Sequence, residues 1–228
     1  MSSVNTVTEQ LTRAGQAIEH DSFAIIDHEV GPHAYRPEQW PIVRRMIHAN
    51  ADFEFNGLAA FHPQAVRAGI AAMLRGGAPV VADVEMICSG LSAPRLAHFG
   101  MRAHHFISDA DVIEAAKAED TTRAVQAMRK AQRQGLLAGA IVGVGNAPTA
   151  LIELVRLIRE EGVRPALVVG MPVGFVSAAE SKELMAELVD IPWIVIRGRK
   201  GGSTLVVAVL HALLALAEAQ QRGEHAAP

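Results

Sequence analysis

The sequence is poor in cysteine, in aromatic residues and in positive charge. Cys88 is the one cysteine among 228 residues, so no disulfide can form within the chain and a reducing compartment is expected. The formal net charge is −3, which argues against nucleic-acid binding. Aromatic residues make up 4% and hydrophobic residues 50%, a composition that suits close packing of helices on a sheet.

Long apolar runs are also absent. No run reaches the ~18 residues that a membrane span requires, and the first ten residues lack the apolar stretch of a secretory signal. We therefore expect no membrane partner and a cytoplasmic location. Residues 205–216 are apolar on nearly all sides but too short to span, which predicts a buried or subunit-interface helix. We interpret Cys88, which follows Met86 and Ile87, as a small buried hydrophobe rather than a nucleophile.

The order of the patterns predicts an α/β fold, a three-layer α/β/α arrangement with a mainly parallel sheet. Residues 1–10 are predicted to be a flexible lead-in, and residues 11–228 a single domain. Helical spacing covers 11–29 and 38–50, after which short apolar runs alternate with helical patterns. The predicted strands are 58–61, 80–82, 105–107, 140–144, 166–169 and 193–196. The predicted later helices are 63–75, 109–117, 121–134, 149–161, 178–188 and 203–219.

Three glycine-rich turns, 145–151, 170–176 and 197–203, follow predicted strands. In the first, Asn146 is the expected N-cap and Pro148 lies in the first helical turn. Such turns present backbone N–H groups to anions. Because the carboxyl ends of parallel strands share one edge of a sheet, the turns predict a site for a ligand with several negative groups.

The same turns allow other interpretations. Gly143-Val144-Gly145 resembles the start of a dinucleotide fingerprint, but the third glycine and the acidic residue further on are missing. Arg197, Arg199 and Lys200 are either carboxylate ligands or a solvated basic loop. Sequence alone leaves this choice open.

Two further residues have two interpretations each. His48, late in the helix predicted from residue 38, is either a proton donor or a surface histidine. Asp83 follows a strand and is either a catalytic carboxylate or a cap for the turn directly after it. His104 and His105 would point to opposite faces of a strand, and no spacing matches a zinc site, so no metal is expected.

Several motifs together resemble the precorrin-8 methylmutases of cobalamin biosynthesis. The resemblance runs from about residue 17 to residue 217, and the order of its motifs is more specific than any one of them. The matching segments are Ser22-Phe23-Ala24-Ile25-Ile26, Arg45-Met46-Ile47-His48, Gly145 to Leu151, Pro172-Val173-Gly174-Phe175-Val176, Ala178-Ala179-Glu180-Ser181-Lys182-Glu183 and Gly198-Arg199-Lys200-Gly201-Gly202-Ser203.

The resemblance implies a homodimeric α/β enzyme that moves a methyl group from C-11 to C-12 of a polycarboxylate corrinoid. It implies no cofactor: neither a redox group, nor ATP, nor a methyl donor. The catalytic histidine of the family falls on His48, its helix arginine on Arg123 and its N-terminal serine on Ser22. His48 is accordingly expected to protonate a ring nitrogen, which eases the methyl shift by withdrawing electrons from the ring.

The turns and the resemblance together predict a set of residues that bind the substrate and product. They are Ser22, Arg45, Arg123, Asn146, Ala147, Thr149, Gly174, Glu180, Arg197, Arg199, Lys200, Gly201 and Ser203. Segments 51–54, 106–109 and 199–202 look more like the branch of the family whose substrate contains cobalt. The alternatives are a non-catalytic corrinoid carrier, and a nucleotide-dependent oxidoreductase that the incomplete glycine fingerprint disfavours.

Overall fold

The computed structural model describes residues 12–223, and its centre is a six-stranded sheet. The lead-in predicted for residues 1–10 lies outside the described residues. The strands are β1 (Ala59–Phe61), β2 (Val80–Ala82), β3 (Ala103–His104), β4 (Ile141–Val144), β5 (Leu167–Gly170) and β6 (Trp193–Ile196). Their order is β1-β6-β5-β4-β2-β3, and every neighbouring pair is parallel except β1 and β6.

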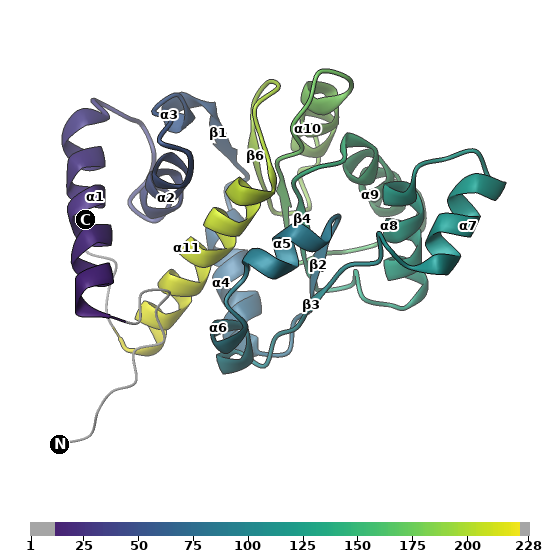
Figure 1. The fold of residues 1–228 in the computed structure, drawn as a ribbon, viewed down its shortest axis with the longest axis horizontal. Coiled ribbons are helices and arrows are strands. Elements are labelled where there is room, and N and C mark those ends of the chain that lie inside the picture. Colours follow the sequence, from purple (N-terminus) through teal and green to yellow (C-terminus); the bar gives the residue numbers. More distant parts are fainter. Residues whose placement is uncertain (1–11, 224–228) are drawn as a thin grey trace.

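Helices cover both faces of this sheet (Figure 1). One face carries α1 (Arg13–Glu29), α2 (Trp40–Asn50), α3 (Phe55–Leu58), α4 (Ala65–Arg75), α5 (Glu85–Gly90), α6 (Ala93–His98) and α11 (Ser203–Gln221). The other carries α7 (Ala110–Ala118), α8 (Arg123–Arg133), α9 (Pro148–Glu161) and α10 (Ala178–Ala186). Neighbouring residues of a strand pack against the helices on opposite faces of the sheet, as Ile141 and Val142 do. Both faces of the strand must therefore be apolar.

The predicted fold class is therefore confirmed, with local corrections. The strand predicted at 105–107 is wrong, because β3 ends at His104. The short helices α3, α5 and α6 were not predicted. Cys88 is half-buried in α5, where burial raises the pKa of its thiol to about 11. A thiol with that pKa is protonated near neutral pH, which agrees with its interpretation as a hydrophobe.

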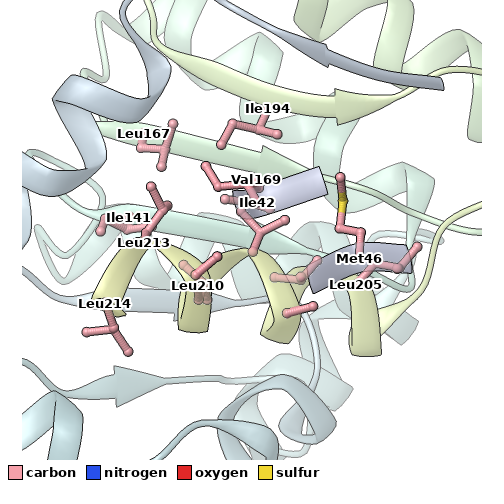
Figure 2. Packing of buried hydrophobic residues seen from close by; sticks show 14 of the residues in the cluster. Ile42, Met46, Ile141, Leu167, Val169, Ile194, Leu205, Leu210, Leu213 and Leu214 are labelled. Atoms are coloured by element: carbon pink, nitrogen blue, oxygen red, sulfur yellow. The ribbon is translucent and has the colours of Figure 1, made fainter. Parts of the chain in front are cut away.

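Helix α11 is the central helix of its layer. It packs on α2, α4 and α5, and Figure 2 shows Leu205, Leu210 and Leu213 among side chains of α2 and of the strands. By length and composition α11 could cross a membrane, but 67% of its most apolar window is buried inside the domain. Of the two roles predicted for residues 205–216, the structure shows the buried core helix.

The topology brings distant segments to one edge of the sheet, which we call the carboxyl edge. The parallel strands β2, β4, β5 and β6 all end there. Strand β1 runs in the opposite direction and so begins there, with Ala59 opposite Ile196. The chain between α2 and β1 therefore meets the turns that follow β4, β5 and β6.

Candidate active site at the carboxyl edge

The turn after β4 is organised by a carboxylate of the protein itself. Asp83 is fully buried, and its two oxygens accept hydrogen bonds from the backbone N–H groups of Gly145 at 3.0 Å, Asn146 at 2.9 Å and Ala147 at 2.7 Å. Burial raises the pKa of Asp83 above its ordinary value, and the three donors act in the opposite direction. Asp83 thus satisfies donors that would otherwise be exposed at the start of α9.

This arrangement corrects two predictions about that turn. The N–H groups of Asn146 and Ala147 are not available to a ligand, because they bind Asp83. The N-cap of α9 is Ala147 rather than Asn146, with Pro148 as the first helical residue. Gly145 is required by close packing, since a Cβ there would lie 2.7 Å from the Cα of Ser203. The exposed side chain of Asn146 remains a predicted ligand contact.

The turns after β5 and β6 are joined along their backbones. The N–H of Gly174 donates to the carbonyl of Arg199 at 3.2 Å, and the N–H of Gly202 to that of Met171 at 2.8 Å. At Gly201 a Cβ would lie 2.7 Å from the carbonyl oxygen of Pro172, so only glycine fits the contact. Residues 171–177 and 197–202, which we call the paired loops, therefore behave as one unit.

A buried lysine of α10 donates hydrogen bonds to both of the paired loops. Lys182 is 1% exposed, and its ammonium donates to the carbonyl oxygens of Pro172 at 3.0 Å and Lys200 at 2.7 Å. Burial lowers the pKa of Lys182 to about 8. The family motif contains this residue, but sequence alone indicates no role for it. Its position in the inward stripe Ala178, Ser181, Lys182, Met185 was a signal that could have revealed its burial.

Lys200 connects the paired loops to the chain that follows α2. Its ammonium pairs with the carboxylates of Asp52 at 2.5 Å and Glu54 at 2.9 Å. These hydrogen bonds raise the pKa of Lys200, and the bond from Lys200 lowers the pKa of Asp52. Lys200 is thus not a free cation, since the protein already supplies two counter-charges. No local pattern indicates this pairing, because the partners are 148 residues apart.

His48 lies in the last turn of α2, exposed to solvent. Its ring makes an edge contact with Phe23 of α1, with centroids 5.2 Å apart. Two residues further along α2, Asn50 accepts a hydrogen bond from Thr204 at 3.3 Å, at the start of α11. The Asn50 and Lys200 contacts together hold the end of α2 at the carboxyl edge.

Two residues predicted to bind substrate lie near His48 but have partners within the chain. The hydroxyl of Ser22 donates to the carbonyl of Ile18 at 2.8 Å, within α1. Arg45 pairs with Glu19 at 2.9 Å and lies over the ring of Phe23 at 5.4 Å. A ligand that binds these groups must compete with, or add to, these contacts.

The structure brings Arg123 and Thr149 to neighbouring helix starts. The hydroxyls of Thr122 and Thr149 are 3.0 Å apart, and Thr122 caps α8, whose first residue is Arg123. Arg123 is exposed and forms no ion pair within residues 12–223. It is therefore a cation that can meet an acidic ligand.

The remaining predicted residues are distributed along the carboxyl edge. Arg199 lies over the ring of Phe175 at 5.6 Å, and Glu180 is exposed in the first turn of α10. Ser203 is buried at the start of α11. Arg197 and Trp193 line a hollow of about 400 Å³ beside β1. His48 does not line this hollow.

The edge also exposes apolar side chains. Phe175 is 85% exposed and Val176 82% exposed, and Arg199, which has no ion pair within the described chain, lies over the Phe175 ring. Apolar surface next to an arginine fits a flat ligand with a carboxylate rim. His48 can supply a proton to a ligand that reaches the end of α2.

Comparisons with known proteins show the family of the chain. Residues 17–216 match the model of the precorrin-8X methylmutase family. The cobalt-precorrin-8 methylmutase of Leptospira interrogans is 52% identical over 94% of this chain and 99% of its own length. The protein of the same name from Priestia megaterium is 51% identical over 93% of both chains. A crystal structure of the precorrin-8x methyl mutase from Thermus thermophilus superposes with a TM-score of 0.83 at 50% identity, over 92% of this chain and 100% of that chain.

The fold and these relatives define an intramolecular methyltransferase, an enzyme of the isomerase class. The chain belongs to the precorrin-8X methylmutase family and acts in cobalamin biosynthesis. This finding disfavours both the carrier and the oxidoreductase alternatives.

The role of Asp83 predicts a loss of stability when its charge is removed. In Asp83→Asn the amide has one acceptor oxygen and places its own N–H groups near three backbone donors. We expect the free energy of unfolding to fall by at least about 2 kcal/mol in urea titrations. Asp190→Asn is the control, since its exposed pairing with Arg164 at 3.4 Å should contribute under about 0.5 kcal/mol. Equal stability of the two variants would contradict the role of Asp83.

Proposed function

We propose that the enzyme catalyses the C-11 to C-12 methyl shift that converts cobalt-precorrin-8 to cobyrinate, with His48 as the proton donor. The imidazolium form of His48 gives a proton to the conjugated ring system of the substrate, the ring becomes electron-poor, and the methyl group moves within the molecule. The proton then returns to His48, so no co-reactant is consumed. A positioned acid of this kind contributes about 10²–10⁴-fold in rate.

The observation that carries this proposal is the attachment of the end of α2 to the carboxyl edge. Lys200 pairs with Asp52 and Glu54, and Thr204 bonds Asn50, so the exposed His48 is held beside the loops. An acid is effective only when it is held at a fixed place relative to the bound substrate. The fixed loops and the fixed helix end meet that requirement.

We propose that Arg123, Arg197 and Arg199 bind carboxylates of the corrinoid, because none of them has an ion pair within residues 12–223. Lys200 contributes charge next to Asp52 and Glu54, and also holds the end of α2. The other proposed contacts are Ser22, Arg45, Thr149, Gly174, Glu180, Gly201 and Ser203, with the side chain of Asn146 and the Cβ of Ala147.

Two observations favour the cobalt-containing substrate. Both sequence relatives described above are named cobalt-precorrin-8 methylmutase. Segment 51–54 also resembles that branch of the family, and its Asp52 and Glu54 form the ion pairs with Lys200. We further propose that the enzyme is cytoplasmic, as the single cysteine favours.

The proton-donor role predicts a large kinetic loss in His48→Ala. We expect kcat to fall about 10²–10⁴-fold, because the ring must then be protonated by water. The measurement follows the absorption change of cobalt-precorrin-8 and of metal-free precorrin-8 with wild type and variant. A higher kcat/KM for the cobalt form would support the proposed substrate, and a higher value for the metal-free form would contradict it.

The control for this experiment is His98→Gln, which changes an exposed histidine of α6 that contacts Gln221. It should retain wild-type turnover. Near-normal turnover by His48→Ala would contradict the proton-donor role. Binding of both corrinoids by the wild type without conversion would contradict the proposed reaction.

The carboxylate contact proposed for Arg123 predicts weaker binding in Arg123→Met. A hydrogen bond between charged groups contributes about 1.5–3 kcal/mol, so we expect KM to rise about 10- to 100-fold. Arg67→Met is a matched control, because Arg67 is exposed on α4, which follows the opposite end of β1. An unchanged KM and product affinity in Arg123→Met would rule out the contact.

We propose that the enzyme is a homodimer. Since α11 is buried in its own subunit, we propose that the partner approaches the exposed Phe175 and Val176, so that the ligand lies between the two subunits. Sedimentation should give twice the mass of the chain, and Val176→Ser should shift it toward monomer. Val189→Ser, at a side chain 85% exposed elsewhere, should not. A fully active wild-type monomer would contradict the proposal.

A further inference from the structure

Lys182 is a buried cation without a carboxylate partner in residues 12–223. Its two hydrogen bonds go to backbone carbonyl oxygens, at 3.0 Å and 2.7 Å. Removing a charge from water is costly unless the site compensates for it. A side chain that only filled space in the stripe of α10 could be apolar, as Ala178 and Met185 are. Filling space therefore does not explain why this position carries a charge.

The two carbonyl groups belong to different members of the paired loops. Pro172 lies in the segment after β5 and Lys200 in the segment after β6. Each accepting carbonyl is next to a residue already fixed to the other loop, since Met171 accepts from Gly202 and Arg199 from Gly174. Lys182 thus adds hydrogen bonds from α10 to the backbone hydrogen bonds that already join the paired loops.

Lys200, whose carbonyl accepts from Lys182, also contacts the segment after α2, the helix that carries His48. The carbonyl of Lys200 accepts from Lys182, while its ammonium pairs with Asp52 and Glu54 after α2. A displacement of the Lys200 backbone would therefore move the anchor of the helix end that carries His48. The chain of contacts runs from α10, through Lys200, to α2.

We infer that Lys182 is a positioning residue of the methylmutase: its buried ammonium fixes the paired loops and, through Lys200, the end of α2 that carries His48. This rests on the proposed function in one respect, namely that the paired loops and His48 contact the corrinoid. With a pKa of about 8, Lys182 is mostly protonated at neutral pH and can donate to both carbonyl groups.

The first test does not depend on activity. In Lys182→Met the stem is replaced by a side chain of similar length without donors. Hydrogen exchange of the amides of Gly174 and Gly202, which join the paired loops, should accelerate at least tenfold, while Val168 and Val169 in β5 stay protected. Lys117→Met, at an exposed lysine of α7, is the control and should change neither region.

The second test is kinetic. We expect kcat/KM for cobalt-precorrin-8 to fall at least tenfold in Lys182→Met, with the larger part of the change in KM, and to recover partly in Lys182→Arg, which keeps donors. The double variant Lys182→Met with Lys200→Met should lose less than the product of the two single losses, because both act through Lys200. A multiplicative loss would contradict the route through Lys200.

Wild-type exchange at Gly174 and Gly202 in a folded Lys182→Met protein would overturn the inference. If Lys182→Met does not fold, Lys182→Gln and Lys182→Arg decide the matter, and exchange as fast in the arginine variant as in the glutamine variant would also overturn it. Absence of turnover by the wild type would instead refute the proposed function, while the exchange experiment would still test the role of Lys182.

Discussion

Two buried charges of opposite sign hold the backbone of the carboxyl edge. Asp83 binds three N–H groups of the turn after β4, and Lys182 binds one carbonyl group from each of the paired loops. The loops have little regular hydrogen bonding of their own, so these charges replace it. The result is a rigid rim on which exposed side chains keep fixed positions. Such a rim can hold a bound substrate in one orientation relative to a proton donor.

The charged residues of the edge divide into those that have a carboxylate partner within the described chain and those that have none. Lys200 and Arg45 have carboxylate partners, whereas Arg123 and Arg199 have none within residues 12–223. The sequence could identify all of them as candidates but could not divide them. The division depends on contacts such as that between Lys200 and Asp52, two residues that are 148 positions apart in the sequence.

The fold was more predictable than the site for a physical reason. Strands such as β4 and β6 are buried on both faces, so their apolar runs mark them clearly. The six-residue helices α5 and α6 are too short to show a helical period, and β3 has only two residues. At the site, the turn after β4 was correctly placed, but its resident anion was missed because Asp83 lies 62 residues before Gly145.

The packing of α2 on α11 has a consequence for how the protein is made. The apolar face of α2 rests mainly on a helix that ends at residue 221. During synthesis this face emerges long before α11, which begins at Ser203, can cover it. The carboxyl edge therefore assembles only after α11 has left the ribosome, and a nascent chain must be kept from aggregating through α2 until then.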